Sequence, residues 1–169
     1  MTNREFHLQC RKNETNAFHR VLNALPHDKW DYTPHEKSQP VAKVVWTLIG
    51  EHQALIDLID KGEFTFGAPP EVPPAKMIDA FEQVWDTLLA RIEKMDESKW
   101  DTKGRFMLGG QVRMEMPISG FLWMFFFDAI HHRGQLSTYI RPMGGKVPSI
   151  YGPSGDDPTM MSAAHRKMQ

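Results

Sequence analysis

The sequence predicts an all-α protein, a four-helix bundle with a short hairpin-like connection before the fourth helix. Three observations lead to this fold class. Four long segments space their apolar residues at the 3.6-residue period of an α-helix. Proline and glycine clusters separate these segments, and only one stretch alternates apolar and polar residues as a strand does. With 169 residues, 41% of them hydrophobic, the chain can bury the core of a single domain, 1–169.

The first two helices are delimited by proline and glycine. The first is expected from about Asn3 to Ala24, where Pro26 follows, and the second from the segment 38–40 to Lys61-Gly62. The apolar face of the first helix contains Phe6, Cys10, Ala17, Val21 and Leu22. The stripe of the second contains Val41, Val45, Leu48, Ile49, His52, Leu55, Ile56 and Ile59.

The second half of the chain begins with a loop, 63–74, whose four prolines predict that it is irregular. The third helix is expected over 74–95. Residues 106–116 alternate around a Gly-Gly pair and predict the hairpin-like connection. The fourth helix is expected over 117–141, and the Pro-, Gly- and Ser-rich remainder, 146–169, as irregular chain over the bundle.

A polar group interrupts the apolar faces of the second and fourth helices. His52 lies in the middle of the second helix's stripe, and Asp128 and His132 lie four apart on one face of the fourth. Bundles build metal sites from side chains on facing helices, so His52, Asp128 and His132 are candidate metal ligands. The alternatives are a core histidine bound to a backbone carbonyl and a surface pair of Asp128 with His132. His131 is placed beside the site.

The donor types restrict the metal. Imidazole and carboxylate suit Zn, Ni, Fe or Mn, and the single cysteine, Cys10, excludes an iron–sulfur cluster. Three protein ligands leave a coordination position open for water or a thiolate. Gln135 and Tyr139 follow His132 on the same face and are the candidate catalytic residues, able to orient a ligand or a bound water. The alternative is that Tyr139 is an ordinary core tyrosine and Gln135 a buried amide, without a role in catalysis.

Two blocks of sequence carry a family resemblance. The end of the fourth helix and the segment after it resemble the C-terminal signature of the DinB/YfiT-like family of metalloenzymes. The matching residues are His131-His132-Arg133-Gly134-Gln135-Leu136, then Tyr139-Ile140-Arg141, Gly144 and Val147-Pro148-Ser149-Ile150-Tyr151-Gly152-Pro153-Ser154. Leu25-Pro26, Trp30, Lys37-Ser38 and His52 are similar to its N-terminal pattern. The resemblance spans residues 5–156.

The resemblance implies a four-helix bundle, often a homodimer, with a nickel or zinc ion held by three histidines. The first and last ligands fall on His52 and His132, and the middle histidine is replaced by Asp128, which shifts the expected metal towards Fe or Mn. The resemblance also suggests that Tyr151 caps the site. Family members include metal-dependent thiol transferases and a mycothiol-dependent isomerase, so an S-transferase or hydrolase using a low-molecular-weight thiol is expected. The alternative is a non-catalytic, stress-associated dimeric bundle with a structural or lost metal site.

Composition limits the partners. The 20 Lys+Arg balance 21 Asp+Glu and form no basic stripe, which excludes a nucleic-acid binder despite the family's damage-inducible name. The longest apolar run, 121–127, is shorter than the ~20 residues of a membrane-spanning helix. We therefore expect a cytoplasmic protein acting on a small molecule.

A second apolar face on the fourth helix predicts a homodimer contact, with packing inside the protomer as the alternative. That face contains Trp123, Phe126, Phe127 and Ile130. The histidines outside the site are expected on the surface: His7, His19, His27, His35 and His165.

Overall fold

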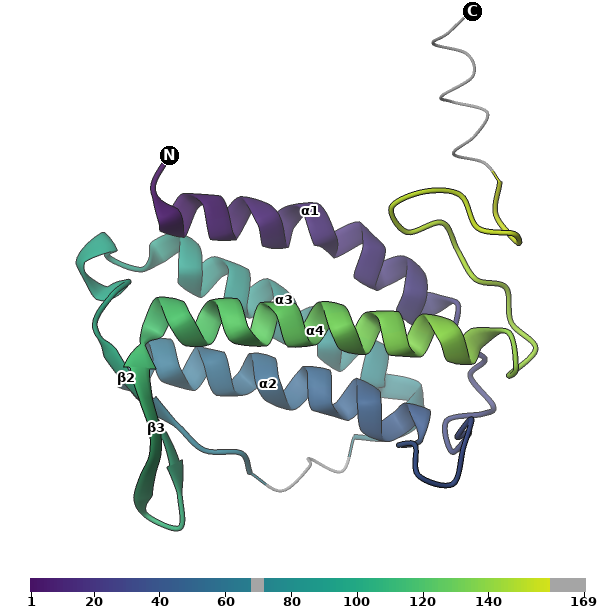
Figure 1. Cartoon of the computed structure of the whole chain (residues 1–169), viewed down its shortest axis with the longest axis horizontal. Coiled ribbons are helices and arrows are strands. Elements are labelled where there is room, and N and C mark those ends of the chain that lie inside the picture. Colours follow the sequence, from purple (N-terminus) through teal and green to yellow (C-terminus); the bar gives the residue numbers. More distant parts are fainter. Residues whose placement is uncertain (68–71, 159–169) are drawn as a thin grey trace, which may run out of the picture.

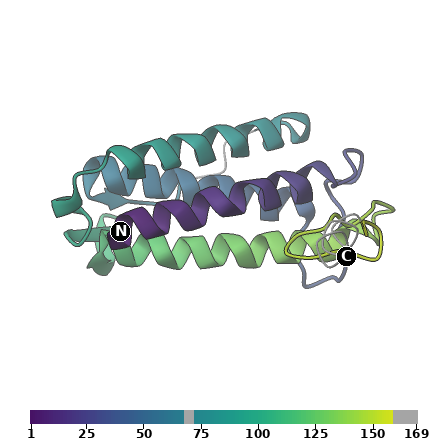
Figure 2. The ribbon, with the colours of Figure 1, turned by 90° about the horizontal axis from the view of Figure 1, so that it is seen from above.

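In a computed structural model of the chain, residues 1–67 and 72–158 are described, and four long helices make up most of the fold (Figure 1). They are α1 (Asn3–Asn23), α2 (Val41–Lys61), α3 (Met77–Lys94) and α4 (Ile118–Ile140). The four predicted helices are confirmed, with small shifts at their ends. Both α1 and α2 pack against α3 and α4, which lie on opposite sides of the bundle in Figure 2.

Local sequence explains where the helices begin and end. Thr2 and Glu5 form a reciprocal capping box at the start of α1. Gly62 ends α2 with a φ of 78°, a left-handed conformation that glycine adopts without a steric cost. A 3₁₀ turn, η1 (Pro74–Lys76), leads into α3, and another, η2 (Glu97–Lys99), follows it.

The all-α prediction is wrong, because the structure also contains a three-stranded mixed sheet and is 58% helix and 10% strand. The strands are β1 (Glu63–Phe64), β2 (Lys103–Leu108) and β3 (Gln111–Pro117). The antiparallel pair β2–β3 is the predicted hairpin. Its turn, Gly109-Gly110, has φ values of 60° and 75°, as tight hairpin turns require.

The remaining strand, β1, comes from the segment 63–74, which was expected to be irregular. Its four prolines all follow residue 68, so Glu63 and Phe64 keep the backbone donors that pair β1 with β2 in parallel. Phe64 is buried against the rings of Phe106 and Phe121, whose ring centroids both lie 5.2 Å from its own. Burial of this aromatic ring fixes the strand against α4.

The buried face of α1 differs from the prediction. Phe6 is 47% exposed and Cys10 is only partly buried, whereas His7 and Arg11 are completely buried. His7 was expected on the surface, but its Nε2 accepts a 2.8 Å hydrogen bond from Arg11 Nε, and its ring packs edge-on against Trp123. This hydrogen bond pairs His7 Nε2 with Arg11 Nε, whereas the buried His7 Nδ1 has no partner among the described residues. His165 lies outside the described residues.

The segment after α4 is irregular as far as residue 158, as predicted for that part. Tyr151 holds it to the bundle, because its hydroxyl accepts a 2.6 Å hydrogen bond from Arg133 Nη2 and donates to Glu14 at 3.0 Å. In the described part of the chain, none of the helices combines the length and apolarity needed to cross a membrane.

Candidate metal centre

Three acidic and imidazole side chains converge between α2 and α4. Glu51, Asp128 and His132 each offer one ligand atom, and these atoms all lie within 4.8 Å of one another. Asp128 and His132 lie one helical turn apart, with 3.6 Å between Oδ2 and Nε2. Glu51 faces them from α2. The structure thus brings two of the three predicted ligands together and adds a carboxylate that the sequence analysis missed.

Glu51 is only 4% exposed, and its Oε2 has no hydrogen-bond partner among the described residues. Burial, aided by a hydrogen bond to Asp128 and the charge of Asp128, raises the pKa of Glu51 to about 9, while the charge of Arg11 acts in the opposite direction. Buried polar oxygens without a partner are rare in folded proteins. A divalent cation at this point would take the place of the Glu51 proton and supply the missing partner, so the donors fit a metal ion.

The tautomer of His132 follows from a chain of hydrogen bonds. The carbonyl of Gln39 can only accept, so the Tyr139 hydroxyl donates to it at 3.3 Å. Tyr139 therefore accepts from the Gln135 amide nitrogen at 3.0 Å, which turns Gln135 Oε1 towards His132 Nδ1 at 3.1 Å. Nδ1 then carries the proton, and the bare Nε2 faces the two carboxylates. The candidate residues Gln135 and Tyr139 thus orient the imidazole.

His52 does not join this group. Its Nδ1 donates to the Leu48 carbonyl at 2.6 Å, and its Nε2 lies 3.3 Å from Arg11 Nη1. Its ring packs against Phe81 and Trp85, and burial together with the Arg11 charge lowers its pKa to about 3. His52 occupies the position described by the alternative interpretation, a core histidine bound to a backbone carbonyl.

Helical spacing could have revealed Glu51. Apolar residues lie three and seven positions before it and four and seven positions after it, so it shares their stripe. These residues, all buried, are Val44, Leu48, Leu55 and Leu58. A glutamate inside a four-residue apolar stripe indicates a compensated buried charge.

A buried guanidinium lies behind the site. Arg11 donates to His7, faces His52, and donates from Nη2 to the Leu122 carbonyl at 3.2 Å. Its carbon Cζ lies 4.8 Å from the centroid of the Phe126 ring. No carboxylate in the described part of the chain hydrogen-bonds it, and burial lowers its pKa to about 9 against the opposing charge of Glu51. The positive charge of Arg11 therefore stabilises ionised Glu51.

The surroundings of the group are partly open. The Asp128 side chain is 46% exposed and that of His132 is 18% exposed. His131 is exposed, and it lines a surface hollow of about 500 Å³ together with Asp128. On the α2 side, Glu51 lines a cavity of about 400 Å³. Glu51, Asp128 and His132 together are called the metal-type group. Tyr151, which was expected to cap the site, hydrogen-bonds Glu14 and Arg133, and neither residue belongs to this group.

The fold and site together define a helical bundle with a cluster of metal-type donors between two helices. The chain belongs to the DinB family, whose family model matches residues 1–167. An uncharacterised protein of Bacillus subtilis strain 168, YrdA, is 25% identical over 150 residues, which cover 85% of each chain. The family resemblance predicted from the sequence is confirmed.

Three solved structures share the fold. A DinB-like protein of Bacillus cereus ATCC 10987 superposes with a TM-score of 0.70 and 20% identity, covering 87% of this chain and 97% of that one. A DinB-like protein of Bacillus subtilis superposes with a TM-score of 0.64 and 18% identity, covering 82% of this chain and 91% of that one. A mycothiol-dependent maleylpyruvate isomerase superposes with a TM-score of 0.60 and 15% identity, covering 95% of this chain and 66% of that one.

Proposed function

We propose that this protein is a metal-dependent enzyme whose single divalent ion is held by Glu51, Asp128 and His132. The observation that carries the proposal is the convergence of these three side chains around a buried Glu51 oxygen that has no partner among the described residues. Two carboxylates and one imidazole form an oxygen-rich donor set. Such a set suits Mn, Fe or Zn, and it is harder than the three-histidine set that the family resemblance implies.

We further propose a reaction that uses a low-molecular-weight thiol, of the S-transferase or hydrolase type. When bound, the ion would supply a Lewis acid with open coordination positions for a thiol or a substrate oxygen. The protein's own part is to hold His132 in one tautomer through Gln135 and Tyr139 and to keep Glu51 buried. The shared fold of a mycothiol-dependent isomerase supports this class of reaction.

Metal content tests the proposal. Untagged protein loaded with Mn, Fe, Zn or Ni and then desalted is expected to retain one ion per chain, measured by inductively coupled plasma mass spectrometry. Glu51→Gln and His132→Ala should abolish retention. Asp60→Asn, which changes an exposed carboxylate of the same helix, should retain the ion. Wild-type protein that retains none of the four metals, or Glu51→Gln protein that retains as much as wild type, would contradict the proposal.

The thiol is tested separately. The visible absorption spectrum of cobalt-loaded protein is expected to gain a sulfur-to-metal charge-transfer band when cysteine or 2-mercaptoethanol is added. Serine, which lacks the sulfur, is the control. A spectrum that neither thiol changes would contradict thiol use while leaving metal retention as an independent result.

A second candidate is a non-catalytic bundle that has lost its metal. The observation in its favour is that a protonated Glu51 hydrogen-bonds Asp128, so a proton can satisfy this pair without a metal. This candidate predicts that Glu51→Gln, which keeps a hydrogen-bond donor, preserves stability and that none of the four metals is retained.

We also propose that two copies of the chain associate through α4. Of the predicted face, Phe126 is buried inside the protomer, whereas Phe127 is 62% exposed and stacks on Trp123. Met124 adds further exposed apolar surface beside it. Light scattering coupled to size-exclusion chromatography is expected to give a dimer that Phe127→Asp converts to monomer, and a monomeric wild type would refute this.

A further inference from the structure

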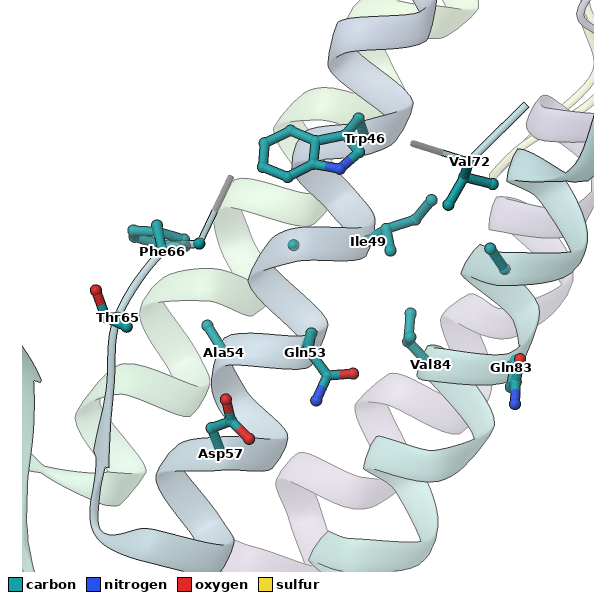
Figure 3. Close-up of a pocket in the computed structure, with 13 residues that line it drawn as sticks. Trp46, Ile49, Gln53, Ala54, Asp57, Thr65, Phe66, Val72, Gln83 and Val84 are labelled. Carbon is teal, nitrogen blue, oxygen red and sulfur yellow. The ribbon is translucent and has the colours of Figure 1, made fainter. Parts of the chain in front are cut away.

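Three side chains of α2 bring polar groups to one cavity. The cavity, of about 400 Å³, is lined by Lys43, Trp46 and Glu51 on the helix, with Phe66 among the facing residues. A neighbouring cavity of about 430 Å³ shares Trp46 and Phe66 (Figure 3). The two cavities therefore adjoin along the outer face of α2.

Lys43 provides a cation without an anion. Its Nζ lies 4.4 Å from the centroid of the Trp46 ring, an arrangement that holds the ammonium group at the cavity. Within the described residues, no carboxylate forms an ion pair with Lys43 and no acceptor receives a hydrogen bond from its Nζ. The positive charge is thus available to a ligand.

Trp46 provides a donor without an acceptor. Its Nε1 is buried and has no hydrogen-bond partner among the described residues. Figure 3 shows this nitrogen on the edge of the indole ring that faces the other lining residues of the larger cavity. Since buried side-chain donors are nearly always paired, an acceptor from a ligand or a water is expected there.

Glycine at position 50 leaves the space beneath the indole ring empty. A Cβ atom placed on Gly50 would lie 3.4 Å from the Trp46 ring, and Gly50 lines both cavities. Glycine in the middle of a helix is unfavourable relative to alanine. Its presence here keeps the cavity floor at the level of the backbone.

The spacing along α2 sets the size of the ligand. Lys43 and Glu51 are eight residues apart, a rise of about 12 Å along the helix axis, and both side chains reach the same cavity. A small molecule can therefore contact the Lys43 ammonium group at one end and the metal-type group at the other. The cavity volume lies in the range of small-molecule sites.

We infer that this cavity binds the substrate as a small organic anion, with its carboxylate or phosphate on Lys43 and its apolar body between Trp46 and Phe66. The inference rests on the proposed function in one respect, the placing of the reacting end of the substrate at Glu51. Binding of the anionic end depends only on Lys43 and Trp46, so it is testable without metal.

The test follows the indole N–H signal of Trp46 in ¹H–¹⁵N correlation spectra, assigned with Trp46→Phe. Benzoate, phenyl phosphate and the neutral isostere benzamide are titrated into metal-loaded and chelator-treated protein. At least one of the two anions is expected to shift this signal saturably in both forms, and benzamide to bind more weakly. The stronger of the two anions identifies the carboxylate or the phosphate class.

Variants assign the binding to Lys43. Lys43→Met is expected to weaken anion binding about tenfold, the loss of one charge-assisted contact, and Lys43→Arg to restore most of it. Lys94→Met removes an exposed lysine of α3 and should have no effect. Equal affinity for benzamide and the anions, unchanged binding by Lys43→Met, or no saturable shift with either anion would each overturn the inference. Anion binding without metal retention would refute the proposed metal function alone.

Discussion

Gln135 fixes the tautomer of His132: its Oε1 accepts from Nδ1 at 3.1 Å, so Nε2 is the ring nitrogen that faces Asp128 and Glu51. The orientation originates at the Gln39 carbonyl and passes through the Tyr139 hydroxyl, because a carbonyl can only accept. Such outer hydrogen bonds fix ring orientation and ligand basicity in metal sites.

Gln135→Ala is therefore expected to weaken metal binding about tenfold or more, because the ring loses the acceptor that holds it. Tyr139→Phe, which removes the next hydrogen bond along the chain, should have a smaller effect in the same direction. Competition titration with a chelating dye measures both affinities. Ser137→Ala is the control, since its hydroxyl bonds only the Gly134 carbonyl among the described residues. Long-range ¹⁵N spectra that place the proton of metal-free His132 on Nε2 would contradict this account.

Acid is expected to destabilise the fold through His7. Burial and the Arg11 charge lower the pKa of His7 from 6.5 to about 3, so the folded state excludes a proton that the unfolded chain binds below pH 6.5. The contribution of His7 to the unfolding free energy should fall between pH 6.5 and pH 3 by up to about 1.4 kcal/mol per pH unit, in addition to that of His52, whose pKa is lowered to the same value. Urea unfolding of wild type and His7→Gln, which keeps an acceptor for Arg11, measures this contribution. Equal pH slopes in the two proteins would show that His7 does not titrate this way.

Arg11→Met should lower the unfolding free energy by about 3 kcal/mol, because it leaves His7, His52 and the Leu122 carbonyl without their buried donor. It should also strengthen metal binding at neutral pH, because the Arg11 charge, which acts against a proton on Glu51, acts more strongly against a divalent ion in its place. Arg20→Met, an exposed change on the same helix, should stay within about 0.5 kcal/mol. Urea unfolding and metal titration at one pH separate the two effects. A variant as stable as wild type would show that the guanidinium is not an essential donor.

Gly50→Ala should stabilise the protein by about 0.5–1 kcal/mol, because alanine is the better helix former and its Cβ meets the Trp46 ring at an ordinary contact distance. The same methyl group occupies the cavity floor, so anion binding should weaken. Thermal unfolding and the benzoate titration measure these opposite effects. Gain of stability with unchanged affinity would place the ligand away from Gly50.

Periodicity identified the four helices because each helix is recorded in the local spacing of its own apolar residues. It could not identify β1, because two residues, Glu63 and Phe64, pair with a strand some forty positions later in the chain. The fold class was therefore predicted incorrectly although the helices and the hairpin were predicted correctly. Such long-range pairing leaves no period in the sequence.

The candidate site divides in the same way. The spacing of Asp128, His132, Gln135 and Tyr139 along one helix placed them on one face, and their hydrogen bonds follow that face. Helical spacing marks both Glu51 and His52 as residues beside apolar stripes, but it does not show which of the two meets α4, because that depends on how α2 is rotated in the bundle. Arg11 of α1 lies against His52 in the core, whereas Glu51 lies beside Asp128 and His132 of α4. Sequence alone thus determined the helices, the family and the polar face of α4, whereas the packing of α1 and α2 decided which side chain completes the group.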